Sequence, residues 1–371
     1  MPLSRRDLGW SRTLLTGALA ALSANAAVVA QKQKDPKPDA AAQAAAMAQQ
    51  QEFQTVVRVA DAAMSGTATP ADFPIQFQND YLRAQNSRVW VPFILTLDPA
   101  KTPAAVTMYL RVTPRGMTAP LAPAAPAAPE KPAKDNKDKK KTDAKQPPAA
   151  APDYPYQDLA LLDLKAAPGQ PLRIMRGIGV PTGSYDLYVV LRERAAAGAT
   201  ARTSVLKQPL DVPNYSTGEL MTSSVILAER VDQLPAPVTP EQQSEHPYAF
   251  GQTEIVVAPD HRFKKSQELI VLLQIYNPPL SGDKKFNLEA TYTFYRTEGG
   301  AEKRFNNTEP QTLTPENTGG TFDPSGNNAV QAGQGIPLQS FPEGVYRLEI
   351  KITDKLSSKV VTQNVNFTVA P

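Results

Sequence analysis

The chain contains no cysteine and only two histidines, His246 and His261, in 371 residues. The absence of cysteine excludes disulfides, thiolate metal sites and cysteine nucleophiles. Two histidines leave little material for a histidine-based metal site or for Ser-His-Asp catalysis. The sequence also lacks a P-loop, a dinucleotide fingerprint, a Gly-x-Ser-x-Gly elbow and a His-Glu-x-x-His motif. These absences predict a protein that is not an enzyme and that uses no metal and no cofactor.

The excess of one sign of charge is also small, because 39 Lys and Arg residues are balanced by 36 Asp and Glu residues, which leaves a net charge of +3. Nucleic-acid binding usually needs a strongly basic face, so no nucleic-acid partner is predicted. Beyond the first 30 residues no apolar run reaches the length of a membrane-spanning helix. The mature chain is therefore predicted to have no transmembrane span.

Residues 1–30 have the three-part layout of an export signal. Arg5 and Arg6 precede an apolar stretch at 14–29, and small residues follow before Gln31. The apolar stretch is short for a retained anchor, so we expect a cleaved signal peptide and a periplasmic or secreted protein. The run from Ser4 to Leu8 is also similar to the twin-arginine motif, and the sequence leaves the Sec and twin-arginine routes open.

Proline is abundant, with 36 residues, about twice the usual share. Residues 31–70 are expected to form a linker that contains a short helix, because 40–63 is rich in alanine and glutamine. Nothing in the pattern requires this helix to be docked. Residues 114–152 contain a Pro/Ala run followed by a Lys/Asp run, which predicts a disordered, solvated insertion. An arm that contacts a polyanion is the alternative for this segment.

Elsewhere the apolar residues alternate with polar ones at the period of a β-strand. In the clearest case, Tyr346, Leu348, Ile350 and Ile352 alternate with polar residues, and a second such strand follows the turn at 354–358. The two make a C-terminal antiparallel hairpin. The other predicted strands lie at 88–97, 105–113, 157–164, 172–177, 185–192, 205–212, 219–228, 253–258, 268–276, 288–297, 311–313 and 331–337.

The hairpin unit occurs twice, since residues 181–187 (PTGSYDL) align with residues 342–348 (PEGVYRL). In each copy the glycine permits the turn that starts the strand, and the tyrosine packs inward while its hydroxyl reaches a backbone partner. We therefore assign structural roles to the following residues: Gly183, Tyr185, Leu187, Gly344, Tyr346 and Leu348.

Six or seven short strands in each copy predict an all-β fold of two tandem immunoglobulin-like or fibronectin-like β-sandwiches. The first sandwich is expected at 71–215, with the insertion at 114–152 inside it, and the second at 216–371. Without disulfides, apolar cores must supply the stability of both.

The stretch GSYDLYVVLRE at 183–193 and its return to 228 resemble the β-rich region that follows the von Willebrand A domain in bacterial VWFA-related proteins. The stretch FPEGVYRLEIKITDK at 341–355 is similar to the closing sandwich of GWxTD-type envelope proteins. The Asp-x-Ser-x-Ser metal loop of the von Willebrand A domain is missing, and the nearest run, from Asp61 to Ser65, lacks its first serine. The resemblance therefore implies a fold and a compartment, and no metal-dependent adhesion.

Together these features predict an exported, non-enzymatic structural or protein-binding protein of the bacterial cell envelope, whose partner is another envelope protein. A carbohydrate-binding module is the alternative, and a hydrolase with two carboxylates, such as Asp158 and Asp163, is a third hypothesis. A calcium loop at 323–328 is a further alternative, and the sequence does not identify a small-molecule ligand. Four tyrosines near domain edges are predicted to be exposed interface residues or, alternatively, to seal the two sandwiches together: Tyr154, Tyr156, Tyr215 and Tyr248.

Overall fold

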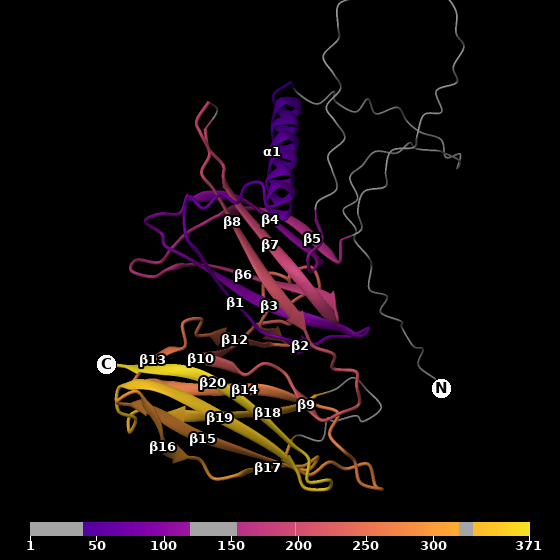
Figure 1. The fold of residues 1–371 in the computed structure, drawn as a ribbon, viewed down its shortest axis with the longest axis vertical. Helices are drawn as coiled ribbons and strands as arrows, with labels where there is room; N and C mark the ends of the chain where they lie inside the picture. The colour runs from indigo at the N-terminus through magenta and orange to yellow at the C-terminus, as the bar shows by residue number, and fades with distance from the viewer. Residues whose placement is uncertain (1–39, 119–153, 197, 319–328) are drawn as a thin grey trace, which may run out of the picture. The chain divides into compact units, whose positions relative to one another are not determined.

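The computed structural model describes residues 40–118, 154–196, 198–318 and 329–371 (Figure 1). The predicted signal segment, most of the predicted insertion and the predicted calcium turn lie outside these residues. Two compact units divide the chain, residues 1–47 and residues 48–371. The second unit contains every strand of the described chain together with the later turns of helix α1 (Ala40–Met64), and it is the unit analysed below.

The first sandwich, residues 75–212, consists of two antiparallel sheets. One sheet has the order β5-β4-β7-β8, with β4 (Ala105–Pro114), β5 (Tyr156–Asp163), β7 (Gly183–Glu193) and β8 (Thr203–Val212). In the other, β3 (Arg88–Leu97) pairs with β1 (Ile75–Asn79), β2 (Leu82–Arg83) and β6 (Leu172–Pro181). The aliphatic inner faces of these sheets enclose one hydrophobic core.

The second sandwich, residues 221–370, also has two sheets. The first contains β11 (Ala249–Phe250), β12 (Thr253–Val257), β10 (Ile226–Gln233), β14 (Glu268–Tyr276) and β18 (Val330–Pro337), with β9 (Met221–Thr222) beside β14. The second contains β13 (Arg262–Lys264), β20 (Val360–Ala370), β19 (Gly344–Asp354), β15 (Leu288–Glu298) and β16 (Ala301–Asn307), with β17 (Gln311–Leu313) beside β15. All pairings are antiparallel except that of β13 with β20.

The predicted all-β sandwich fold is confirmed, and the alternation in the sequence explains it. Along β19 the side chains of Leu348, Ile350 and Ile352 are fully buried, whereas Lys351 between them is exposed. One predicted strand is wrong, because 219–228 is broken into β9 and β10. The break lies where the Ser224 backbone N–H donates to Tyr81 O of the first sandwich, at 3.0 Å.

The repeat places equivalent strands in equivalent positions. Strand β7 lies between β4 and β8, as β19 lies between β15 and β20. The connections differ, because Gly299 and Gly300 turn β15 directly into β16, whereas the predicted insertion joins β4 to β5. The insertion therefore replaces a two-residue turn in an otherwise shared arrangement.

Helix α1 extends only one residue beyond the predicted 40–63, and residues 48–64 pack on the outer face of the sheet that contains β4 and β7 (Figure 1). Val56 and Ala60 are fully buried against Tyr188 and Val190 of β7. Arg111 of β4, buried beneath the helix, forms an ion pair with Asp61. The expectation that the helix need not dock is therefore replaced by a packed helix, because β7 presents apolar side chains on both of its faces.

Candidate functional site

The two repeated tyrosines are buried at the starts of β7 and β19. The Tyr346 hydroxyl donates to Pro342 O at 2.6 Å, and the Tyr185 hydroxyl donates to Thr182 O at 3.4 Å. Gly183 has φ 149°, and a Cβ there would lie 3.1 Å from the Tyr185 hydroxyl. The first corner therefore needs glycine for its backbone and for the close approach of the Tyr185 ring, whereas at Gly344, with φ 150°, a Cβ would meet Arg296 instead. These contacts are structural and internal to each sandwich.

The four edge tyrosines are not exposed, and their hydroxyls or rings lie against neighbouring elements. Tyr215 is only 4% exposed to solvent and Tyr248 only 1%, and Tyr154 and Tyr156 are partly buried. The Arg111 guanidinium lies 4.4 Å above the Tyr154 ring, and Tyr156 packs against the first core. The prediction of exposed anchors is corrected, because burial of these large rings removes apolar surface from water while each buried hydroxyl can find an acceptor.

Tyr248 and Tyr215 instead join the two sandwiches. The Tyr248 hydroxyl donates to Asp80 Oδ2 at 2.8 Å, and the Tyr215 hydroxyl donates to Tyr81 O at 3.1 Å. Tyr81 N–H in turn donates to Ser224 Oγ at 2.9 Å. The alternative interpretation, in which these tyrosines seal the sandwiches together, matches these contacts.

Asp80 is the one buried carboxylate that the described residues place between the two sandwiches. Its side chain is 5% exposed, and burial raises its pKa to about 6, against the hydrogen bonds from Tyr248 and Ser224, which lower it. Burial likewise raises the pKa of Tyr248, and the neighbouring Asp80 raises it further. Around this polar pair lies an apolar cluster of both sandwiches: Leu82, Ile94, Ile226, Tyr248 and Val257.

A connection between β10 and β11 extends over the first sandwich, and we call residues 239–248 the strap. The Trp90 indole N–H donates to Pro247 O at 2.9 Å, and the Gly177 backbone N–H donates to Ser244 O at 2.8 Å. Arg176 and Glu245 add an ion pair at 3.4 Å. The strap therefore covers part of the free edge of β6 with backbone and side-chain contacts.

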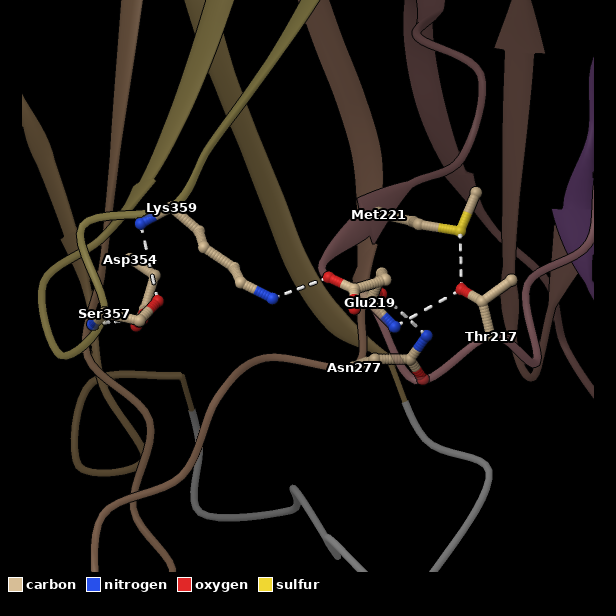
Figure 2. Close-up of polar contacts among 7 residues, drawn as sticks. All are labelled: Thr217, Glu219, Met221, Asn277, Asp354, Ser357 and Lys359. Carbon is tan, nitrogen blue, oxygen red and sulfur yellow. Dashed lines mark hydrogen bonds and ion pairs between the residues drawn. The ribbon is translucent and has the colours of Figure 1, made fainter.

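Figure 2 shows how the segment between the sandwiches is held to the second one. Asn277 Nδ2 donates to Glu219 O at 2.9 Å, and Lys359 forms an ion pair with the Glu219 carboxylate at 2.6 Å. The Glu219 N–H donates to Thr217 Oγ1 at 3.2 Å. Asn277 has φ 51°, a conformation that asparagine tolerates better than most residues. Because Lys359 and Glu219 are both exposed, the asparagine contacts contribute more than the ion pair.

A cleft of about 570 Å³ lies between the face of β1, β3 and β6 and the turn at Pro259. Its polar lining comes from both sandwiches: Gln76, Gln78, Thr96, Arg173, Asp260 and His261. Burial lowers the pKa of His261, and the neutral ring fits its contacts, in which Nδ1 donates to Asn366 O and Nε2 accepts from the Gln78 amide. Asp260 is the single carboxylate in the described lining, so the cleft lacks the carboxylate pair of a glycosidase.

The remaining candidates do not come together as a site. Asp158 and Asp163 are an odd number of residues apart on β5, so they point to opposite faces, and Asp163 forms an ion pair with Arg194. His246 forms a hydrogen bond with Glu254 at 2.9 Å. Among the described residues, only two Phe, Tyr or Trp side chains are more than about a third exposed, Phe53 of α1 at 44% and Phe250 of β11 at 37%. No shared aromatic platform for a glycan is formed there.

Across the parts of the chain that the structure describes, no group of three or more His, Asp and Glu side chains could hold a metal ion. Within the same parts, no helix has both the length and the apolar character needed to cross a membrane.

No protein-family model matches this chain, and no curated protein matches it either.

The polar residues at the junction and beneath the helix were missed by sequence reasoning. Arg111 had a usable signal, because it interrupts the apolar run of β4 at a position that must face either the core or a cover. Asp80 had none, since an acidic residue after a short strand is typical of a turn. Its partner Tyr248 is far away in the sequence.

Proposed function

We propose that this chain is an exported, non-enzymatic protein of the bacterial cell envelope that serves as a structural or protein-binding module. The observation that carries the proposal is the junction of the two sandwiches, in which Tyr248, Tyr215 and the strap contact the first sandwich. Buried polar contacts of this kind favour one arrangement of two modules over a loose tether. A composite surface made by two modules suits recognition of another macromolecule.

The features that favour export lie in the sequence, and the resemblance to VWFA-related and GWxTD-type proteins remains a prediction. Export is tested by fractionating the native bacterium and sequencing the mature N-terminus, with cleavage expected near Ala30. Replacement of Arg5 and Arg6 by lysine separates the two routes, because a twin-arginine substrate would then stay in the cytoplasm and a Sec substrate would still be exported. An uncleaved chain in the cytoplasm of wild-type cells would contradict the proposal.

The binding function is tested by purifying the full-length protein from the native envelope after in-cell crosslinking. We expect the same stoichiometric protein partner in independent purifications, and its absence when an unrelated exported sandwich protein is purified in the same way. Loss of that partner without the crosslinker is compatible with a transient interface. Repeated failure to recover a partner, together with substrate turnover by the pure protein, would reject a non-enzymatic binding module.

A further inference from the structure

The outer edge of β18 carries backbone groups that have no backbone partner among the described residues. Leu338 N–H donates to Gln267 O, so the alternation of antiparallel pairs directs Gln331, Gly333 and Gly335 away from β14. Of their N–H and C=O groups, only Gly333 O has a described contact, with the Gln311 amide at 3.4 Å. Pro337 follows at the next outward position and has no N–H, which ends the edge.

Two outer strands of the first sandwich, β6 and β8, are covered or carry charge. On β6, the Gly177 N–H donates to Ser244 O of the strap. Strand β6 is the counterpart of β18 in chain order, because β6 precedes β7 as β18 precedes β19. Val205 N–H of β8 donates to Pro70 O, and Lys207 and Pro209 follow on that strand. Beside the uncharged β1, the Phe73 N–H is bonded to Ser204 Oγ. Lysine, proline and a covering segment are the usual protections of a sheet edge.

In the second sandwich, β16 carries Glu302, Lys303 and Arg304. Strand β20 is held to β9 by a side-chain contact, in which the Gln363 amide donates to Thr222 Oγ1 at 2.8 Å. Strand β18 contains no Asp, Glu, Lys or Arg between its first and last residues. The two glycines of β18 lie beneath side chains of β14, because a Cβ at Gly333 would collide with Leu272 and a Cβ at Gly335 would collide with the Glu268 carboxylate. Among the described residues, the edge from Gln331 to Gly335 therefore carries no charged residue, no proline and no covering backbone segment.

We propose that β18 is a self-association edge, at which a second copy of this chain adds its own β18 antiparallel to the first. A two-fold axis at Gly333 pairs Gly333 with its copy and Gln331 with Gly335 of the other copy. Every outward N–H of these residues then meets an outward C=O, because the same pattern runs in both directions. The uncharged strand opposes no like charges across the axis.

Side chains favour the same register. In the paired arrangement, Gln331 of one copy lies opposite Gly335 of the other, on the face where the Glu268 carboxylate already covers Gly335. The Gln331 amide can then donate to that carboxylate across the interface. Pairing about Gly333 therefore satisfies the outward groups from Gln331 to Gly335 in both copies at once, which favours β18 itself as the occupant.

The test is the mass of the full-length mature protein by sedimentation equilibrium from about 1 µM to about 200 µM, a range that covers weak homodimers. We expect a reversible increase from monomer to dimer. Gln331→Glu is expected to weaken the dimer at least about tenfold, because it places a second carboxylate beside the Glu268 carboxylate of the other copy. Gln76→Glu, an exposed change on β1 in the first sandwich, is the matched control and is expected to leave the dimer unchanged.

Hydrogen exchange supplies a second measurement on the wild type. The amides of Gln331, Gly333 and Gly335 should become protected as concentration rises, whereas outward amides of β8 should not. A wild type that stays monomeric over the whole range overturns the proposal. A dimer that Gln331→Glu does not weaken, or that Gln76→Glu weakens equally, also overturns it. Recovery of an envelope partner does not depend on either result, so the proposed function is judged separately.

Discussion

The first and second sandwiches share a hairpin but differ in what covers its outer face. Inner positions of β7 and β19 are matched, with Tyr185, Leu187, Val189 and Leu191 in one and Tyr346, Leu348, Ile350 and Ile352 in the other, all of them buried. Outer positions diverge, since Tyr188 and Val190 of β7 occupy the places of Glu349 and Lys351 of β19. Helix α1 covers the first pair, and the second pair faces water.

This difference shows that the same strand pattern can lie beneath a helix or at the surface, and that its outward-facing residues alone decide which. The inner row specifies the sandwich in both copies, whereas the outer row decides whether a further layer is added. Apolar outer residues on β7 need a cover, and Val56 and Ala60 of the helix supply it. Four changes would break or sharpen this comparison, and they are ordered below from the largest expected effect to the smallest.

Val190→Lys would place on β7 the lysine that β19 carries at the equivalent position, Lys351, and should have the largest effect on stability. Val190 is fully buried beneath the helix, so a lysine there would be a buried, unpaired charge. We expect a loss of at least about 3 kcal/mol in the free energy of unfolding, with release of residues 48–64 from the sheet. Urea unfolding and hydrogen exchange of the helix measure both effects. The reciprocal Lys351→Val, at an exposed site, should change stability by less than about 0.5 kcal/mol; equal effects of the two changes would contradict the comparison.

Asp61→Ala would leave Arg111 buried without its ion-pair partner. Only 3% of the Arg111 side chain is exposed, but Asp61 is 37% exposed, so removing the carboxylate of this half-buried pair should cost about 2–3 kcal/mol. Glu302→Ala is the control in the second sandwich, because Glu302 pairs with Arg347 at the surface, where such pairs contribute less than about 1 kcal/mol. Urea unfolding of both variants checks this. A cost for Asp61→Ala no larger than that for Glu302→Ala would mean that the helix is not held by this pair.

Asp80→Asn tests the junction that couples the two sandwiches. The pKa of Asp80 is raised from 3.8 to about 6 in the folded protein, so the folded state binds this proton more tightly than the unfolded state does. Stability should therefore fall as pH rises from about 4 to about 6, by up to about 3 kcal/mol. The asparagine variant should lose this pH dependence and be more stable at pH 7 by a similar or smaller amount.

Unfolding by urea at a series of pH values measures this dependence. Asp98→Asn, a change at an exposed carboxylate of the first sandwich, should keep the fall in stability between pH 4 and 6. The assignment to Asp80 fails if the wild type shows no such fall, or if the asparagine variant retains it.

The two tyrosine corners offer the smallest and finest comparison. Tyr346→Phe removes a hydrogen bond of 2.6 Å, and Tyr185→Phe removes one of 3.4 Å. We expect a cost of about 1 kcal/mol for Tyr346→Phe and a clearly smaller cost for Tyr185→Phe, since a long hydrogen bond contributes less. Paired thermal and urea unfolding would resolve the difference. A larger cost at Tyr185 would reverse the ranking of the two corners.

Much of the fold could be predicted from local pattern. Strands β3 and β14 begin and end at the predicted residues, because each carries a dense run of β-branched and aromatic residues bounded by turns. Strands β13 and β16 were missed, since their charged residues hide the alternation. Docking of the helix had a signal in the continuous apolar run of β7 from Leu187 to Leu191, which predicts burial on both faces.

The candidate site was less predictable, because it depends on contacts between distant residues. Tyr215 and Tyr248 were found as aromatics near domain edges, but their burial follows from the way the second sandwich meets the first. The strap had no local signal, since its proline-rich sequence is typical of a solvent-exposed loop. Its role comes from contacts with Trp90 and Gly177 on strands of the other sandwich.

The sequence by itself determined the β-sandwich class, the repeated Gly-x-Tyr-x-Leu hairpin and the inner rows of both cores, because alternation and turn chemistry are local properties of the chain. Only the tertiary structure decided that residues 48–64 of α1 are docked, that Asp80 is buried against Tyr248, and that the strap covers part of β6 while no described strand pairs with the outer edge of β18. Burial of a side chain and the pairing of a strand edge depend on which elements approach each other. No local pattern contains that information.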